Sequence, residues 1–211
     1  MKNFYLRLIS TGLLAPIIIF FLYKLNFFFY SLLFFVVILS FIEIFNNVRQ
    51  KYISLILYLL ILLFAYSVLE IRSSNYKGFI ECLWVMSIVW ASDISGYMVG
   101  KLIGGPKLSV YSPNKTISGF LGSIFFSQIS IFIPLTFLNN FKFNLSFIFL
   151  QFFLSCVSVL GDIFFSYIKR INKIKDYSNI IPGHGGILDR IDGMIFVFIF
   201  YFILSLTLDV F

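Results

Sequence analysis

Long apolar runs separated by short polar segments make up most of the chain. Runs of Leu, Ile, Phe and Val predict about seven transmembrane helices, at residues 8–23, 26–45, 53–70, 79–99, 117–137, 145–168 and 191–209. The first run is short for a hydrocarbon core about 30 Å thick, so the first two helices would form a tight or tilted hairpin. The pattern therefore predicts an all-α, polytopic membrane protein.

Composition supports this class and argues for one domain. The mean hydropathy is +1.00 and only 12% of the residues are charged, whereas a soluble domain would carry about a quarter. No internal repeat or low-complexity linker divides the sequence. We expect a single integral-membrane domain over residues 1–211, with N-terminal helices at about 8–72 and a second region at about 79–211 that holds the polar clusters.

The basic residues predict the orientation of the helices. The net charge of +7 need not indicate nucleic acid, because Lys and Arg accumulate in the cytoplasmic loops of membrane proteins. With a cytoplasmic N-terminus, the outer segments hold only Lys24, Arg72, Lys77 and Lys142. The cytoplasmic segments then hold Lys2, Arg7, Arg49, Lys51, Lys101, Lys107, Lys115, Lys169, Arg170, Lys173, Lys175 and Arg190.

Charge is concentrated between residues 166 and 192. Eight of the 25 formal charges lie in these 27 residues, between two apolar runs. Four residues at the start of this segment and just before it lie on one face of a helix, because they are spaced at positions i, i+4, i+7 and i+8: Asp162, Ser166, Lys169 and Arg170. A carboxylate within a span is costly, so Asp162 indicates a functional interior or, alternatively, an ion pair with a neighbouring helix.

Two further carboxylates begin the last apolar run. Asp189 and Asp192 lie at i, i+3, and with Asp162 they could supply the oxygen ligands of Mg²⁺. The alternative is a plain helix start, where Asp interacts with the positive end of the helix dipole. Just before them, glycines surround the only histidine, His184, and would let backbone N–H groups converge on a phosphate; a structural hydrogen-bonding role is the alternative for this histidine.

A second polar cluster lies between Ser92 and Gly119. It contains Asp93 near the end of one predicted helix and SPNKT before the next. In SPNKT, Asn114 and Thr116 can cap the helix and Lys115 can reach a phosphate, although a simple cap and turn would also account for the motif.

The pattern S-x-x-K-R-x4-K-D-x-S-x3-P-x-H-G-G-x-x-D-R-x-D resembles the signature of the phosphatidate cytidylyltransferases. Its fixed positions are occupied by Ser166, Lys169, Arg170, Lys175, Asp176, Pro182, His184, Gly185, Gly186, Asp189, Arg190 and Asp192. SDISGYMVG and SPNKTISG resemble two upstream motifs, and RLISTGLLAP with the later Glu43 resembles the N-terminal region of the family.

The resemblance implies transfer of the cytidylyl group of CTP to phosphatidate, with residues 79–211 as the catalytic region. Asp162 and Asp189 would be metal ligands, and Lys169 and Asp192 would complete the catalytic set. Phosphate contacts would come from Lys169, Arg170, Lys175 and Arg190, and one substrate phosphate would contact Asn114 and Lys115. Ser166, Asp176, Gly185 and Gly186 would line the substrate site, and His184 would contact nucleotide or phosphate.

The resemblance also implies Mg²⁺ as cofactor, with room for a second, monovalent cation. The partners would be CTP, phosphatidate and membrane lipids, with no nucleic acid, and a homodimer is compatible with the family. The location would be the bacterial plasma (inner) membrane, with the active site facing the cytoplasm.

Two departures from the family pattern leave alternatives open. Phe165 and Ser118 stand where the family commonly has Glu, so a non-catalytic relative is one alternative. Another is a CTP-dependent polyprenol or phytol kinase, and a third is a transporter in which Asp93 and Asp162 line an ion path. A CDP-alcohol phosphotransferase is disfavoured because its D-G-x2-A-R spacing is absent.

Overall fold

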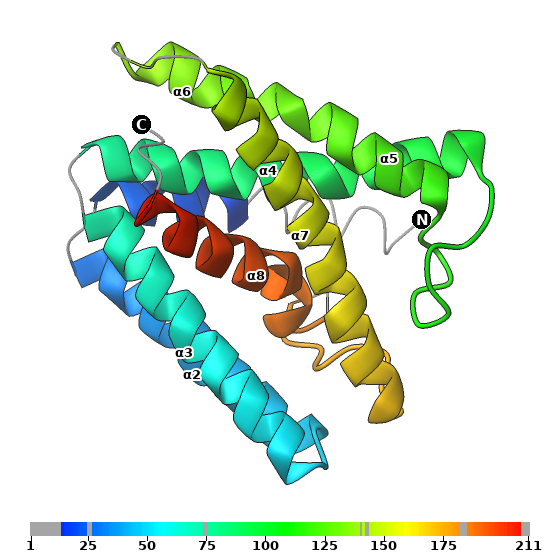
Figure 1. The fold of residues 1–211 in the computed structure, drawn as a ribbon. Helices are drawn as coiled ribbons and strands as arrows, with labels where there is room; N and C mark the ends of the chain where they lie inside the picture. Colours follow the sequence, from blue (N-terminus) through cyan, green and yellow to red (C-terminus); the bar gives the residue numbers. More distant parts are fainter. Residues whose placement is uncertain are drawn as a thin grey trace.

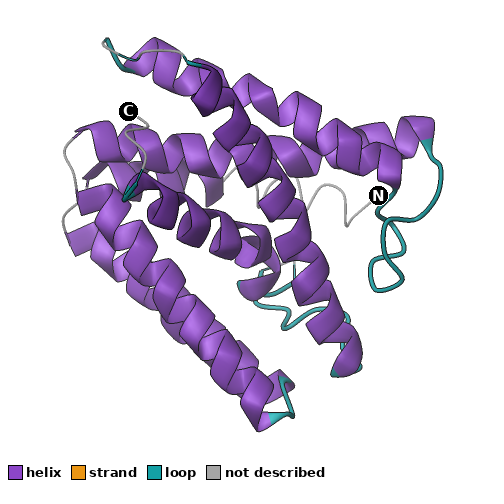
Figure 2. Ribbon diagram, viewed as in Figure 1, coloured by secondary structure: helices purple, strands orange, loops and turns teal. Residues whose placement is uncertain are grey.

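The structure is a computed structural model that describes residues 14–24, 27–73, 76–139, 141, 144–181 and 185–207. These residues are helical apart from the connecting loops (Figure 2). After an N-terminal helix, Leu14–Lys24, the elements are α2 Phe27–Asn47, α3 Lys51–Ser73, α4 Tyr76–Ile103, α5 Ile117–Phe126, the 3₁₀ helix η1 Ser127–Ile131, α6 Phe132–Phe137, α7 Leu145–Ile171 and α8 Leu188–Ser205.

The chain is a multi-pass membrane protein. Among the described residues, five stretches are long and apolar enough to cross a bilayer: α2, Lys51–Arg72, α4, Ile117–Phe137 and α7. Many large apolar side chains on these stretches are exposed, such as Phe34, Phe45 and Leu59, as expected where lipid is the solvent. The run expected at 117–137 is divided into α5, η1 and α6, and the expected first helix is described only from Leu14.

Helix α8 lies at the centre of the bundle (Figure 1). It packs against α7, α3 and α4, while α2 and α3 lie side by side and α4 packs along α5. Trp84, Leu154 and Ile195 are fully buried where α4, α7 and α8 meet. The last helix of the sequence is therefore surrounded by earlier ones, which brings distant polar segments to its first turn.

Small residues allow α4 and α5 to approach closely. A Cβ on Gly119 of α5 would lie 2.7 Å from the backbone oxygen of Gly96 and 3.3 Å from the Cα of Gly100. Both glycines belong to α4, and their spacing of four residues places them on one face. This contact fixes the start of α5, and with it the preceding loop that carries Asn114 and Lys115.

Three polar segments meet at one end of the molecule. The side chain of Asn47 donates to the Tyr177 carbonyl at 2.6 Å, and the Arg49 N–H donates to Asn172 Oδ1 at 2.9 Å. Arg170 Nε in turn donates to the carbonyl of Tyr111 at 3.4 Å. The turn after α2, the loop 104–116 and the loop 172–187 therefore share one end, as the distribution of basic residues predicts.

Candidate functional site

Asp162 and Asp192 are brought together by close packing of α7 on α8. A Cβ on Gly161 would lie 3.2 Å from the carbonyl oxygen of Asp192, and one on Gly193 would lie 2.8 Å from Asp162 Oδ1. The absence of side chains at these two glycines lets the helices approach until the neighbouring carboxylates interact. The backbone of α8 at Asp192 and Gly193 therefore lies directly against Gly161.

The loop 104–116 places Lys115 on the Asp162 carboxylate. Gly104 and Gly105 have φ of 69° and 109°, values that glycine adopts without strain and that turn the chain sharply after α4. The loop then folds back on itself, since the N–H of Leu108 donates to the Lys115 carbonyl at 2.8 Å. The Lys115 ammonium forms an ion pair with Asp162, so the partner of this aspartate comes from a loop and not from the neighbouring helix that the alternative interpretation expected.

The helix cap expected from SPNKT is present, and the lysine of the motif faces the carboxylates. Thr116 Oγ1 accepts the N–H of Gly119 at 3.0 Å and caps α5, as expected from the motif. Lys115, the preceding residue, projects toward the carboxylates, where Asp93 of α4 also lies close enough to Asp162 to hydrogen-bond with it. The cap therefore holds the backbone from which Lys115 reaches the site.

Lys169 connects the two carboxylates of α8. Its buried ammonium lies 2.7 Å from Asp189 Oδ1 and 3.9 Å from Asp192 Oδ2. Asp189 is buried as well, and its other oxygen accepts the N–H of Tyr177 at 2.8 Å and that of Gly186 at 3.0 Å. The carboxylate of Asp189 thus joins α7, the start of the loop 172–187 and the start of α8.

Tyr177 forms the apolar side of this junction. Its ring lies under the Lys169 ammonium, 5.7 Å from the centroid, and contacts the ring of Phe165. Burial, reinforced by the nearby Asp189 carboxylate, raises the pKa of the Tyr177 phenol, which stays neutral at physiological pH. Within the described part of the chain its hydroxyl has no hydrogen-bond partner, so it is a buried polar group available to another partner.

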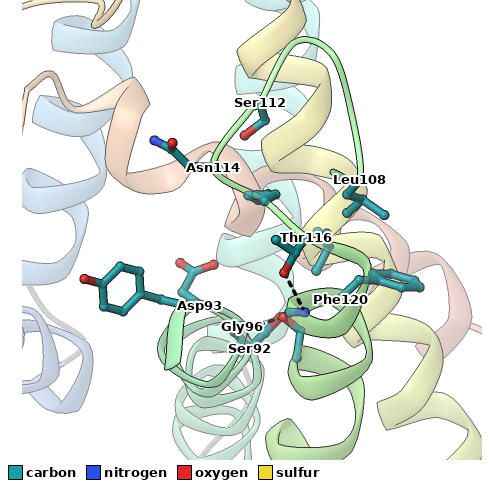
Figure 3. A pocket seen from close by; sticks show the side chains of 13 residues that line it. Ser92, Asp93, Gly96, Leu108, Ser112, Asn114, Thr116 and Phe120 are labelled. Atoms are coloured by element: carbon teal, nitrogen blue, oxygen red, sulfur yellow. Dashed lines mark hydrogen bonds between the residues drawn. The ribbon is translucent and has the colours of Figure 1, made fainter. Parts of the chain in front are cut away.

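Two cavities meet at Asp93. The first, of about 250 Å³, lies between α4, the start of α5 and the loop 104–116; several polar side chains are part of its lining, among them Ser92, Asp93, Asn114, Lys115 and Thr116. In Figure 3 the Asp93 carboxylate points from α4 toward the loop that carries Asn114. The second, of about 480 Å³, is mainly apolar, with Asp93 and Arg190 beside Leu14, Ala15, Ile18, Met86, Trp90, Ile94, Ile191 and Met194.

The remaining predicted residues lie around this cluster. Arg170 is exposed and donates to the carbonyls of Tyr111 and Ile174. Ser166 is half-buried on α7, Lys175 and Asp176 are exposed on the loop 172–187, and Gly185, with φ of 82°, lies against the Asp176 side chain. The structure brings Lys115, Asp162, Lys169, Asp189 and Asp192 together, whereas His184 lies outside the described residues.

Sequence reasoning did not assign a role to Glu43 of α2, which reaches the same region. Its carboxylate accepts hydrogen bonds from the Ser178 hydroxyl and from the N–H groups of Ile187 and Leu188. A single acidic residue within the apolar stretch FIEIF was the available signal.

The two departures from the family pattern have structural roles. Phe165 is fully buried and packs on Phe164, Tyr177 and Phe196, away from water. The Ser118 hydroxyl donates to the carbonyl of Gly104 and thereby helps to close the loop 104–116.

The chemistry of the cluster fits a magnesium ion. Among the described residues, only two ammonium groups, those of Lys115 and Lys169, lie within ion-pair distance of the carboxylates of Asp162, Asp189 and Asp192. A further carboxylate, that of Asp93, lies beside these aspartates. The excess of negative charge suits a divalent cation. Among the described residues, no group of three His, Cys, Asp or Glu side chains is placed to hold a metal ion; Mg²⁺ in proteins takes one or two carboxylates and completes its shell with water and substrate phosphates.

Known proteins resemble much of this chain. The model of a cytidylyltransferase family matches residues 47–208. A phosphatidate cytidylyltransferase of Helicobacter pylori (strain ATCC 700392 / 26695) is 40% identical over 124 residues, 57% of this chain and 46% of its own length. The phosphatidate cytidylyltransferase of Bacillus subtilis (strain 168) is 39% identical over 143 residues, which are 65% of this chain and 52% of the relative. That of Staphylococcus aureus (strain COL) is 43% identical over 125 residues, which are 57% of this chain and 47% of the relative. The chain thus spans about half the length of the curated relatives it matches.

Proposed function

Because the chain belongs to the cytidylyltransferase family, we propose that it transfers the cytidylyl group of CTP to phosphatidate, giving CDP-diacylglycerol and pyrophosphate for phospholipid biosynthesis. The observation that carries this proposal is the pair of cavities that meet at Asp93. One is bordered by several polar side chains, including Lys115, and the other is larger, more strongly apolar and bordered by Arg190. A triphosphate nucleotide suits the first and a lipid phosphate with its acyl chains suits the second.

The reaction is an in-line displacement at phosphorus. An oxygen of the phosphatidate phosphate attacks the α-phosphorus of CTP, the new P–O bond forms and the bond to pyrophosphate breaks. Both substrates are anions, so the protein must align them and neutralise their charge more than it must move protons. Lys115 and Lys169, which now pair with Asp162 and Asp189, are placed to exchange these partners for phosphate oxygens.

The carboxylates take the complementary role. We assign Asp162 and Asp189 to the metal, with Asp192 beside them, because these carboxylates share the Lys115 and Lys169 ammonium groups, and Lys115 lines the first cavity. A bound Mg²⁺ would neutralise phosphate charge and help to orient the leaving group. Arg170, Lys175 and Arg190 lie on the exposed rim, where they would contact the outer phosphates of the nucleotide or the headgroup of the lipid.

The location we propose is the bacterial plasma membrane, with the site on the cytoplasmic side, where CTP is available. Support comes from the hydrogen bonds that join the three basic segments at one end and from the positive-inside rule. We also propose that the chain has about seven membrane helices with a cytoplasmic N-terminus and forms one domain over residues 1–211. A homodimer, which is compatible with the family, completes the proposal.

Removal of the metal is expected to stop the reaction. Membranes that contain the protein, incubated with labelled CTP and phosphatidate, should form labelled CDP-diacylglycerol with Mg²⁺ and none with EDTA, and re-added Mg²⁺ should restore the rate. Membranes without the protein are the control. Equal product formation in EDTA would contradict the metal assignment, and label in a phosphorylated alcohol would instead indicate a CTP-dependent lipid kinase.

A further inference from the structure

The carboxylate of Glu43 is almost completely inaccessible to solvent, with 1% of the residue exposed. Glu43 belongs to α2, outside the stretch 47–208 that the family model covers. Its Oε1 accepts the Ser178 hydroxyl at 2.6 Å and the Ile187 N–H at 2.8 Å, and its Oε2 accepts the Leu188 N–H at 2.9 Å. A buried carboxylate with this many donors aimed at it is held in one position.

These contacts replace a missing helix cap. The first N–H groups of any helix have no partner inside the helix and are usually capped by a nearby Ser, Thr, Asp or Asn. Within the described residues, α8 has Ile187 at this position and no side-chain cap of its own. Glu43, more than 140 residues earlier in the chain, supplies the acceptor and places a negative charge at the positive end of the α8 dipole.

The packing around Glu43 leaves little freedom. A Cβ on Gly186 would lie 2.5 Å from Glu43 Oε1, so Gly186 is the residue that lets the carboxylate reach the turn. One turn further along α2, Asn47 donates to the Tyr177 carbonyl at 2.6 Å. The N–H groups of Tyr177 and Gly186 are the two that Asp189 binds. Glu43 and Asp189 therefore bind adjacent residues in the same two segments.

We propose that Glu43 is a positioning residue for the part of the site that would hold CTP and its metal ion. It acts through the segments 172–181 and 185–187 and the first turn of α8, and so sets the placement of Asp189 and Asp192. This inference rests on the proposed function, because it takes those residues as the ones that hold CTP and its metal. It also gives the N-terminal helices a role in the reaction beyond anchoring.

The test compares Glu43→Gln with a matched control in the purified full chain. Glutamine has nearly the same shape, but its amide NH₂ would face a backbone N–H that now meets a carboxylate oxygen. The control is Glu81→Gln: Glu81 lies near the opposite end of α4 from Asp93 and accepts the Tyr201 hydroxyl at 3.0 Å. We expect Glu43→Gln to raise the KM for CTP and lower kcat/KM for CTP by about 10- to 100-fold, with the KM for phosphatidate unchanged. Glu81→Gln should leave both KM values unchanged.

The kinetic pattern separates positioning from loss of folded protein. A variant that only unfolds loses kcat in proportion to the inactive fraction and keeps its KM values. An unchanged KM for CTP in Glu43→Gln would therefore overturn the proposal, whatever happens to kcat. Glu43→Asp, which keeps the charge on a shorter side chain, should regain part of the affinity for CTP.

A second readout does not depend on turnover. Lys173 and Lys175 are exposed on the loop, and we expect trypsin to cut there at least several-fold faster in Glu43→Gln than in the wild type or Glu81→Gln. Equal cleavage rates would overturn the proposal. If the wild-type protein makes no CDP-diacylglycerol, the proposed function fails, and faster cleavage would still support Glu43 as the residue that holds this turn.

Discussion

Replacement of Asp162 by asparagine is expected to reduce CDP-diacylglycerol formation by at least about 10³-fold. Removal of one preorganised electrostatic contact to a transition state typically lowers kcat by about 10²- to 10³-fold. The Asp162→Asn change affects two such contacts. It removes the charge assigned to the metal, and it replaces the partner of the Lys115 ammonium by a neutral amide. Asparagine has nearly the same volume, so the packing of Gly161 and Gly193 is kept.

Initial rates of purified Asp162→Asn, with saturating CTP and phosphatidate at several Mg²⁺ concentrations, check this expectation. Glu81→Gln is the matched control, since it neutralises a carboxylate on α4 whose partners are Tyr201 and Lys77 instead of Lys115. A rate within a few-fold of the wild type for Asp162→Asn would contradict the assignment of this residue to the metal.

The second large effect is expected for Lys169→Gln. Lys169 contacts two carboxylates, and Asp189 is almost fully buried. Removal of one partner from a buried ion pair typically destabilises a protein by about 3–5 kcal/mol, because the other charge is left unpaired. We expect Lys169→Gln to lower thermal stability and to reduce kcat by about 10²-fold or more, since the ammonium is also assigned to phosphate.

A double variant separates these two effects. In Lys169→Gln/Asp189→Asn both charges are gone, so thermal stability should recover relative to Lys169→Gln alone. The activity of the double variant should stay at the level of the less active single variant, because both groups are assigned to the reaction. Recovery of activity together with stability would show that the pair is structural only.

The sequence predicted these helices closely because long apolar runs mark them. The expected runs at 26–45, 53–70, 79–99 and 145–168 correspond to α2, α3, α4 and α7, whose ends lie within about four residues of the expected ones. The helical spacing of Asp162 and Lys169 also placed both on α7 and directed them to the α8 carboxylates. Local period and local charge were sufficient for these features.

The contacts that depend on tertiary packing could not be predicted in the same way. The pairing of Lys115 with Asp162 joins residues 47 positions apart, and the bonds from Glu43 to the start of α8 span 144 and 145 positions. They arise because α8 lies between earlier helices and because glycines at 96, 119, 161, 186 and 193 permit close approach. Neither the spacing nor the composition of the chain specifies which helix faces pack together.

The fate of the individual CTP phosphates tests the central claim most directly. Purified protein is incubated with phosphatidate, Mg²⁺ and CTP labelled either at the α- or at the γ-phosphate, and the lipid and aqueous phases are separated. Cytidylyl transfer predicts lipid-phase label from α-labelled CTP only, with γ-label released as pyrophosphate in equal amount. Lipid-phase label from γ-labelled CTP, with CDP in the aqueous phase, would contradict the account.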